Sequence, residues 1–385
     1  MPSKITRKSS CKIKAKSKKT ICIICGKSHR SYYDKKIKYV RDLPCGNLLV
    51  YLQFKHRRVK CKKTGQVRYE PLDWLSNTPG YTKRFAYYAG KRCQSSTIKE
   101  VAEELRIDWK TVKNLEKEYM TEKLRRAGRK DPEVIGIDEI SVKKGHEYRI
   151  IISDLERKQP IWFGGIDRSE SSLDQFYASL NSLQKSKIRL AVMDMWKAFR
   201  KSTRKNVPHT AILFDKFHII RHLNEALDKV RKQEYQKLTG ADRKYIKGKK
   251  YTLLSRQANL DTDGKIALKE LFKVNKRLNK AYILKERFDQ LWTYSREAWA
   301  CKFFEGWKDS LKWQRLKPFE IFAQMIDKHW DGIAAYCRPK NKVALGYVEG
   351  LNNKIRVIQR RAYGLKDEEY LKLKILTCTL PDFID

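Results

Sequence analysis

Two aspartates stand where short apolar runs end, and their side chains are the best placed in the sequence to do chemistry. Asp138 follows the run 134–137, and Asp194 follows the run 188–193. Runs of this length and composition predict buried strands, so each strand would present a carboxylate at its end. Neighbouring carboxylates repel each other unless a cation lies between them, which favours Mg²⁺ or Mn²⁺. Either aspartate alone is better explained as the cap of a turn, but the pair, in a basic protein, favours a metal site.

A third carboxylate lies near the end of the chain, in the stretch 346–364. If this stretch is helical, spacings of three and four residues place several polar side chains on one face. These side chains are Glu349, Asn352, Asn353, Arg356 and Arg360. An ordinary solvated helix more often pairs its arginines with acids, and this stretch has no acid between Glu349 and Asp367. The face therefore suits a metal at one end and a phosphodiester backbone along the rest.

The composition predicts a polyanionic partner. The 385 residues carry a formal net charge of +42, far more than solubility needs, and double-stranded DNA is the expected polyanion. The sequence has neither an apolar run of membrane-spanning length nor a signal peptide, so we expect a cytoplasmic, nucleoid-associated protein with no membrane partner. The nine cysteines lack disulfide-like spacing, which indicates reduced thiols, some of them available to a metal.

A cysteine knuckle near the amino terminus predicts a small zinc ribbon. Cys22 and Cys25 form one pair, and Cys61 follows an alternating segment that predicts a strand. Tetrahedral Zn²⁺ takes thiolates from two such turns, but Thr64 stands where the second pair would be completed. Two interpretations stay open, because either a fourth ligand comes from elsewhere or no zinc binds. The candidates for the fourth ligand are Cys45, His29 and His56.

Residues 97–115 predict two helices joined by a short turn. Thr97 and Glu100 have capping-box spacing, and Asp108 is a suitable N-cap for the second helix. A helix, a turn and a lysine-bearing helix form the plan of a helix-turn-helix, whose second helix enters a DNA groove. A helical hairpin with a solvated charged face is the alternative, and the neighbouring basic ribbon favours DNA. The residues expected to face DNA are Trp109, Lys110, Lys113 and Asn114.

From residue 131 the pattern predicts an α/β fold of the ribonuclease-H-like class. The expected elements are hairpin strands at 134–140, 148–154 and 160–165, a helix over 169–183, then the Asp194 strand, a helix, a strand over 210–215 and a long helix. In such sheets the first and fourth strands lie side by side. Asp138 and Asp194 would therefore meet.

These observations divide the chain into six predicted segments. They are a flexible basic lead-in (1–19), a zinc-ribbon-like module (20–75), a helix-turn-helix (78–122), the first part of the catalytic core (131–231), an all-helical insertion (232–340) and the final part of the core with the Glu349 helix (341–385). The tryptophans of the insertion are expected to serve mainly as core, with one or two able to stack on bases as well.

With these motifs the sequence resembles the ISL3-type family of bacterial insertion-sequence transposases, in the DDE class. The resemblance covers nearly the whole chain and rests on residues 135–146, 193–196, 214–218, 223–228 and 346–364. It implies that Asp138, Asp194 and Glu349 hold two divalent ions, which activate water or a DNA 3′-hydroxyl and steady the leaving oxygen. It also implies that Arg356 grips the transposon end.

The resemblance further places an acid-x-x-His element, Asp215 and His218, beside the active site. These residues, together with Asn353, would orient the metal ligands or the DNA. Zinc binding by Asp215, His218 and His222 is an alternative, although a buried or DNA-facing role is preferred for the histidines. Thr64 is the one departure from the family pattern, and it bears on zinc rather than on catalysis.

Three functions follow from these interpretations. The leading one is a transposase that binds terminal inverted repeats and catalyses metal-dependent phosphodiester hydrolysis and strand transfer, as a homodimer or higher oligomer on DNA because two ends must be paired. The alternatives are a sequence-specific DNA-binding protein without catalysis, such as a repressor or a domesticated transposase, and a structure-specific nuclease. The presence of all three acids favours the first, since a protein under no catalytic demand can lose any of them.

Overall fold

The computed structural model describes residues 8–128, 131–143, 147–239, 243, 246–343, 346–362, 365 and 367–383. Two compact units divide the chain: Met1–Arg129 with Lys354–Asp385, and Lys130–Asn353. Parts of the motifs named above, residues 144–146 and 363–364, lie outside the described residues, as do residues 1–7 of the predicted lead-in. No helix within the described ranges is both long and apolar enough to span a bilayer.

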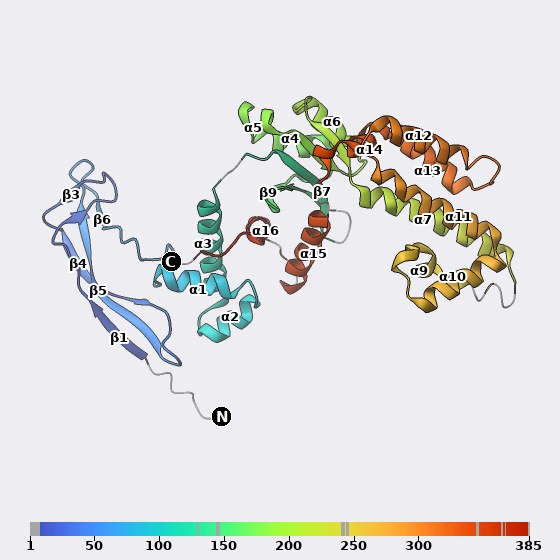
Figure 1. The fold of residues 1–385 in the computed structure, drawn as a ribbon. Coiled ribbons are helices and arrows are strands. Elements are labelled where there is room, and N and C mark those ends of the chain that lie inside the picture. The colour runs from blue at the N-terminus through green and yellow to red at the C-terminus, as the bar shows by residue number, and fades with distance from the viewer. Residues whose placement is uncertain are drawn as a thin grey trace, which may run out of the picture. The chain divides into compact units, whose positions relative to one another are not determined.

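The first unit begins with a small β module. Its strands are β1 (Lys8–Ile13), β2 (Thr20–Ile21), β3 (Ser28–His29), β4 (Asp34–Arg41), β5 (Leu49–Lys60) and β6 (Val67–Tyr69). The long strand β5 is central, because β1 pairs with it in parallel while β4 and β6 pair with it antiparallel (Figure 1). Strands β2 and β3 form a separate hairpin.

Strand β1 corrects the prediction that residues 1–19 form a flexible lead-in. Lys8 pairs with Leu49 and Ile13 with Phe54, so this part of the lead-in is an edge strand. All six residues of β1 are exposed. The strand is held by backbone hydrogen bonds to β5 and not by apolar burial, which explains why composition does not predict it.

Three helices follow the β module, and they confirm the predicted helix-turn-helix. They are α1 (Lys83–Arg92), α2 (Ile98–Leu105) and α3 (Trp109–Ala127). Thr97 and Glu100 form the expected capping box at α2, and Asp108 caps α3 by accepting a hydrogen bond from the Lys110 N–H at 2.8 Å. A Cβ added at Gly90 would lie 2.3 Å from Cβ of Tyr119, so glycine allows α1 and α3 to pack at this distance.

The carboxyl-terminal helix α16 (Glu368–Thr377) belongs to the same unit. Tyr370 is buried in the apolar core of α1, α2 and α3, and its hydroxyl hydrogen-bonds the buried Glu116 carboxylate, which also accepts from Lys374 at 2.6 Å. The segment 341–385, predicted to complete the catalytic core, is therefore divided after Asn353. The apolar face of α16 packs against the helix-turn-helix, and this packing places α16 in the first unit and not in the catalytic core.

The second unit is built on a five-stranded sheet. Its strands are β7 (Val134–Lys143), β8 (Glu147–Asp154), β9 (Gln159–Gly164), β10 (Leu190–Met193) and β11 (Ala211–Phe214), in the order β11-β10-β7-β8-β9. Strands β7, β8 and β9 form an antiparallel meander, whereas β10 lies parallel to both β7 and β11. The prediction that the first and fourth strands are neighbours is confirmed.

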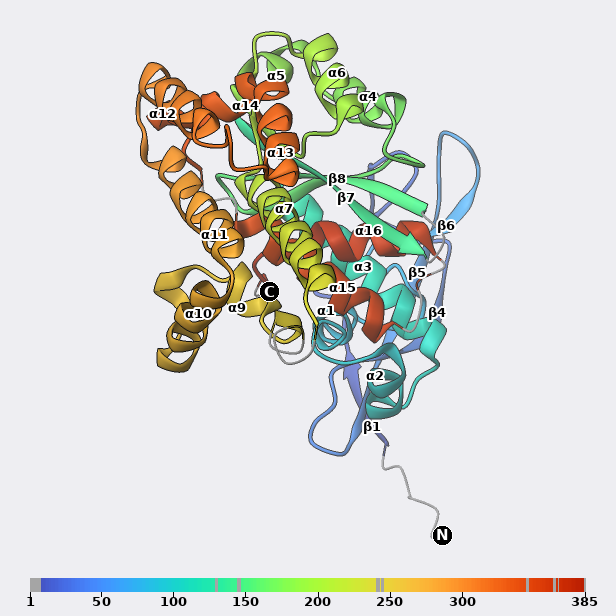
Figure 2. The same ribbon diagram turned by 90° about the vertical axis from the view of Figure 1, so that its right-hand side faces the viewer.

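Helices α4 (Glu170–Ala178), α5 (Ser182–Lys187) and α6 (Lys197–Asn206) accompany the sheet. The single helix predicted over 169–183 is wrong, because the chain breaks after Ala178 and restarts at Ser182. Asn181 explains the restart, since its side chain accepts a hydrogen bond from the Gln184 N–H while Gln184 bonds back in a capping box. The long helix α7 (Lys216–Lys237) then leaves β11 and enters the insertion (Figure 2).

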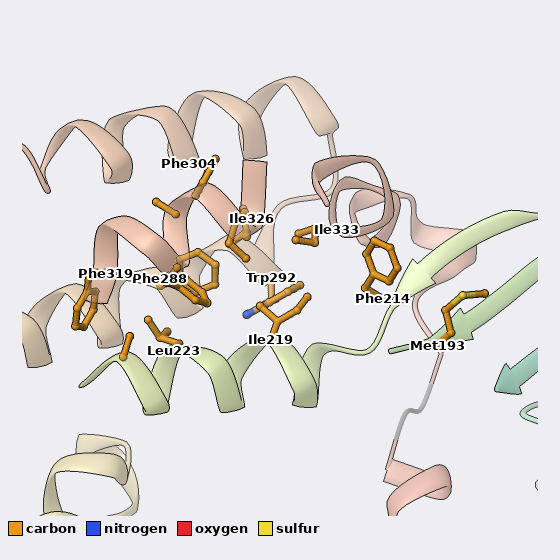
Figure 3. Packing of buried hydrophobic residues seen from close by; sticks show 14 of the residues in the cluster. Met193, Phe214, Ile219, Leu223, Phe288, Trp292, Phe304, Phe319, Ile326 and Ile333 are labelled. Carbon is orange, nitrogen blue, oxygen red and sulfur yellow. The ribbon is translucent and has the colours of Figure 1, made fainter. Parts of the chain in front are cut away.

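The insertion is helical, as predicted. Its helices are α9 (Lys250–Leu254), α10 (Thr262–Val274), α11 (Lys276–Phe288), α12 (Glu297–Asp309), α13 (Lys317–Lys328) and α14 (Trp330–Ala334), with 3₁₀ turns η1 (Gln257–Asn259), η2 (Asp289–Thr293), η3 (Ala335–Cys337) and η4 (Pro339–Asn341). One apolar core continues from the sheet into these helices. In Figure 3 Ile219 and Leu223 of α7 point toward Phe288, Trp292 and Ile326, while Phe214 extends the packing to the sheet.

The tryptophans of the insertion differ in burial, and Trp330 is half-buried against the core. Trp292 and Trp307 are buried, which confirms their prediction as core. Trp299 and Trp313 are exposed, so that prediction is wrong for them. After the insertion, α15 (Gly346–Arg361) completes the described helices that position the site.

Candidate active site

Parallel pairing among β7, β10 and β11 stops at one level of the sheet, and an aspartate follows the last paired residue of each strand; β7 itself continues to Lys143 against β8. Met193 on β10 lies in register with Ile137 on β7 and with Phe214 on β11. The next residue in each strand direction is an aspartate: Asp138, Asp194 and Asp215. The Asp215 N–H donates to the Met193 carbonyl at 2.9 Å, which continues the ladder to this edge. The structure thus brings the two predicted aspartates together and adds Asp215 beside them.

Burial and mutual repulsion act on these carboxyl groups. Burial raises the pKa of Asp138, and the Asp194 charge adds to this rise, while a hydrogen bond from Asn352 opposes it. Burial likewise raises the pKa of Asp215, with Asp138 and Asp194 contributing repulsion. A cluster of this kind is costly without a compensating positive charge. The chemistry of this edge is therefore that of a site for cations.

Helix α15 approaches the same edge through a glycine. A Cβ at Gly136 would lie 2.8 Å from Cδ2 of Leu155 and 3.2 Å from Cγ2 of Val348, so the bare backbone makes room for the first turn of α15. Asn352, on the next turn, donates from Nδ2 to Oδ2 of Asp138 at 2.6 Å. Glu349 precedes Asn352 by three residues and therefore lies on the same side of the helix. Its side chain is exposed.

The histidines of the acid-x-x-His element have different partners. Nδ1 of His218 lies 3.4 Å from Oδ2 of Asp194, which places this ring at the carboxylate edge. His222 instead faces Glu225, with Nδ1 3.3 Å from Oε2. Within the described ranges, Asp215, His218 and His222 do not form a group of convergent metal ligands. The structure therefore gives no support to a zinc site at these three residues.

The asparagine that binds the Asp138 carboxylate is Asn352, whereas the sequence analysis named Asn353 as the residue that orients the metal ligands or the DNA. Asn353 is exposed, and Asn352 alone of the two donates to Asp138. Oδ1 of Asn352 is also buried and has no hydrogen-bond partner among the described residues. This orphaned oxygen fits a site that receives a cation or a cation-bound water, because a buried acceptor is costly when it stays unpaired.

Asn352→Ala is expected to raise the Mg²⁺ concentration needed for half-maximal DNA cleavage by about 10- to 100-fold, the usual cost of losing a group that orients a metal ligand. The Asp138 carboxylate would lose the donor that fixes its orientation. The measurement is a Mg²⁺ titration of cleavage, with Asn353→Ala as the matched control. Equal effects of the two substitutions would contradict the assignment to Asn352.

The predicted DNA-facing residues of α3 lie at its amino-terminal end. Trp109, Lys110 and Asn114 are exposed, with 52% of Trp109 accessible. Lys113 is half-buried, and its ammonium lies 2.8 Å from the Asp367 carboxylate. The same carboxylate holds Lys117 at 3.0 Å. Three of the four predicted side chains are thus open to solvent, whereas Lys113 forms an ion pair with an acid of the same chain.

Arg356 and Arg360 are exposed on the second half of α15, within the unit that contains the helix-turn-helix. Helical spacing places both on one face of α15. A neighbouring guanidinium, that of Arg361, donates to the Gln94 carbonyl at 2.8 Å and so ties α15 to the helical part of its own unit.

Three of the four predicted cysteines converge. The sulfurs of Cys22, Cys25 and Cys61 lie within 4.8 Å of one another. Thr64 lowers the pKa of Cys61 to about 6, chiefly through a side-chain hydrogen bond, so this thiol forms a thiolate readily. Cys45 is not part of the group; it is exposed and its backbone pairs with Leu48.

The two histidines named as possible fourth ligands differ. His56 is buried, donates from Nε2 to the Glu70 carbonyl at 3.0 Å, and stacks on Tyr69, so it is a core residue. His29 follows the knuckle on β3, and its Nε2 is buried without a hydrogen-bond partner among the described residues.

Comparison with known proteins agrees with this geometry. A family model described as "Transposase" matches residues 135–375, and one described as "Helix-turn-helix domain of transposase family ISL3" matches residues 70–120. The chain is 32% identical to the transposase for insertion sequence element IS1001 of Bordetella parapertussis, over 94% of this chain and 89% of that protein. It is 24% identical to the transposase for insertion sequence element IS1557 of Mycobacterium tuberculosis, over 90% of this chain and 83% of that protein. The chain belongs to the ISL3 family of DDE transposases, enzymes of insertion sequences that cleave and transfer DNA.

Proposed function

We propose that the unit Lys130–Asn353 is a ribonuclease-H-like catalytic core in which Asp138, Asp194 and Glu349 hold two divalent cations, Mg²⁺ or Mn²⁺. The observation that carries the proposal is the alignment of two aspartates, Asp138 and Asp194, where the parallel pairing of β7 and β10 stops, with α15 bound to Asp138 through Asn352. Hard cations bind oxygen donors. A bound cation would also stabilise the charged form of these carboxylates, whose pKa burial and repulsion raise.

Glu349 completes this site by a change of side-chain position. Within the described ranges, no three carboxylates have oxygens that all lie within 4.8 Å of one another. Carboxylates without a bound cation repel each other, so we expect the exposed Glu349 side chain to join the two aspartates only when cations bind. Asn352 anchors α15 at Asp138, one helical turn from Glu349, which supports this proposal.

The bound cation pair would activate the attacking oxygen and stabilise the leaving oxygen of an in-line displacement at phosphorus. The chain's own residues prepare for this. Asn352 fixes the Asp138 carboxylate, and His218 faces the Asp194 carboxylate. Asp215 accepts a hydrogen bond from the Phe217 N–H at 2.8 Å and so holds the start of α7, which carries His218, at this edge. No covalent enzyme intermediate is needed.

We further propose that the protein binds the terminal inverted repeats of its insertion sequence through the helix-turn-helix. Trp109, Lys110 and Asn114 would enter the groove, and Lys113 would reach DNA only by leaving Asp367. Arg356 and Arg360 would grip the phosphate backbone of the transposon end. The high positive charge supports this assignment. Pairing of two ends requires at least a dimer on DNA.

Asp367→Asn is expected to increase the affinity of α3 for DNA a few-fold, since it frees Lys113 for phosphates and leaves Lys117 with the exposed Glu369 alone, at 3.3 Å. The lysine contacts hold the pKa of Asp367 far below its usual range, so this acid is charged at every working pH. Asparagine keeps the cap at the Tyr370 N–H while removing the charge. In a plot of log affinity against log salt concentration, the slope should become steeper by about 0.9 for each lysine that is released to phosphate. An unchanged slope would show that these lysines do not reach DNA.

We also propose that Cys22, Cys25 and Cys61 bind Zn²⁺ with His29 as the fourth ligand. Three convergent thiols, one of them acidic, suit zinc. His29 lies outside this convergent group, and its Nε2, which has no hydrogen-bond partner among the described residues, would have to turn toward the thiols to complete the site. The Cys22–Cys25 knuckle and the strand end at Cys61 supply ligands from two turns, as a ribbon does.

The test of the proposed function is cleavage of labelled duplexes that carry the inverted repeats flanking this gene, with Mg²⁺ or Mn²⁺ added. Metal-dependent cuts at the repeat end, followed by joining to a second duplex, are expected. Binding without cleavage by the unaltered protein would leave a DNA-binding protein only. Cleavage of branched DNA without repeats would instead indicate a structure-specific nuclease.

A further inference from the structure

The turn between α12 and α13 holds a tryptophan almost entirely in solvent. The side chain of Trp313 is 95% exposed, more than any other large hydrophobic residue in the described part of the chain. Figure 1 shows this turn at the end of the insertion that lies away from the sheet. An exposed indole forgoes a large burial gain, and such residues commonly mark contact surfaces.

The turn is held in place rather than loose. Leu311 and Leu316, on either side of Trp313, are buried in the core of the insertion. Arg277 donates from Nη2 to the Arg315 carbonyl at 2.7 Å and from Nη1 to Glu234 of α7 at 3.1 Å. The backbone beside the tryptophan is therefore clamped to two helices, and the indole points outward from a fixed support.

The backbone conformation of the turn is also unfavourable. Trp313 has a φ of 69° and Arg315 a φ of 53°, both in the left-handed region that residues with side chains avoid. Such conformations persist only where the surroundings enforce them, and they gather at functional positions. The turn adopts this costly conformation although the indole stays in water, where it adds no burial energy to the unit.

Basic residues lie on both sides of Trp313 in the sequence. The segment 308–317 contains Lys308, Lys312, Arg315 and Lys317 and one acid, Asp309. The three lysines have acidic partners, Lys312 in Asp309 at 2.9 Å, Lys308 in Glu305 at 3.0 Å and Lys317 in Glu320 at 3.5 Å. Arg315, next to the tryptophan turn, has no ion-pair partner within the described ranges. A second copy of this chain would carry the same high positive charge and would be repelled from such a tip. A polyanion with flat apolar surfaces matches both features.

We propose that Trp313 stacks on a base of DNA bound along the insertion, with Arg315 and its neighbouring lysines on the phosphate backbone. The inference rests on the proposed function and adds a second contact region, remote from the carboxylates. An indole with both faces open can stack on any unpaired or flipped base, a contact that tolerates all sequences. Duplex DNA must locally unstack to accept it, which favours mismatched or distorted steps.

The dimensions of the insertion give the expected position of this contact. Helix α13 has 12 residues and runs back from the turn toward α14, which packs on β11. Its length is about 18 Å at 1.5 Å per residue. B-DNA rises about 3.4 Å per base pair, so the stacked base should lie about five or more base pairs from the phosphate held at the carboxylates.

The experiment compares the full chain with Trp313→Ala and Trp313→Phe on repeat-end duplexes that carry 2-aminopurine at successive positions. The unaltered protein is expected to change the 2-aminopurine fluorescence at one position about five or more base pairs from the cut. Trp313→Ala should abolish that change and weaken binding about tenfold, whereas Trp313→Phe should keep most of both. Trp299→Ala, another exposed tryptophan of the insertion, is the matched control and should leave both unchanged. Circular dichroism confirms folding of each variant.

Two outcomes overturn the proposal. Trp313→Ala with unchanged affinity and an unchanged 2-aminopurine profile would show that the indole does not touch DNA. A change in oligomeric state of Trp313→Ala in sedimentation, with DNA contacts intact, would make the turn a protein interface. Cleavage by the unaltered protein is scored separately, so a protein that shows the Trp313-dependent signal but never cuts would fail the proposed catalysis and not this inference.

Discussion

Asp194→Asn is expected to lower DNA cleavage by on the order of a thousandfold or more while leaving binding of the repeat ends intact. Metal-based stabilisation of a phosphoryl transition state is worth several kcal/mol, and each 1.36 kcal/mol is a factor of ten in rate. Asparagine keeps the shape of the side chain and the oxygen that accepts from the Met195 N–H at 2.6 Å. What it removes is the negative charge. The loss should therefore appear in the chemical step and not in folding.

The measurement is single-turnover cleavage and strand transfer of a labelled repeat end, with binding followed in parallel by fluorescence anisotropy. Asp263→Asn, an exposed acid of α10 in the insertion, makes the same charge change away from the sheet edge and should cleave normally. Thermal unfolding of both variants should match the unaltered protein. Cleavage by Asp194→Asn within tenfold of normal would remove Asp194 from the proposed metal site.

Local patterns predict the strands of this site because each is encoded within a few residues. The apolar runs before Asp138 and Asp194 are short and bounded, and burial of both strands is what such runs require. Their adjacency depends on the order of elements, since a meander followed by crossover helices leaves β10 beside β7. The two aspartates were therefore predictable as a pair.

The helix partner of Asp138 is less predictable. Glu349, Asn352 and Asn353 share one broad helix face, and spacing alone does not tell which of the asparagines meets the sheet. The rotation of α15 is fixed by Val348 against the bare backbone of Gly136, a contact between residues more than two hundred positions apart. That contact directs Asn352, and not Asn353, to Asp138.

Long-range polar contacts account for other differences. Lys113 looks like a free DNA contact in sequence, yet Asp367, far along the chain, neutralises it. Strand β1 has no apolar pattern, because its stability comes from pairing with β5. Trp313 was grouped with core tryptophans because composition does not show that Leu311 and Leu316 take the buried positions of the turn.

Cys61→Ser is expected to remove zinc from the protein and unfold the β module, which would abolish recognition of the repeat ends. The module has small apolar clusters, one of them made largely of Cys22, Val59 and Cys61 themselves. A structural zinc supplies about 10 kcal/mol or more in such domains, so a module of this size depends on it. Serine leaves the size of the side chain nearly unchanged but removes the thiolate.

The measurements are the zinc content of purified protein, protease cleavage within residues 20–75, and end binding. Cys45→Ser is the matched control, since Cys45 is exposed and lies outside the convergent group, and it should retain zinc, protease resistance and binding. His29→Ala should lose zinc as Cys61→Ser does if the imidazole is the fourth ligand. Retention of one zinc per chain in Cys61→Ser would contradict the site. If the unaltered protein holds no zinc and still resists protease, Thr64 and the three thiols stabilise the knuckle by hydrogen bonds alone. A hydrogen-bonded thiolate at Cys61 can close this turn without a metal.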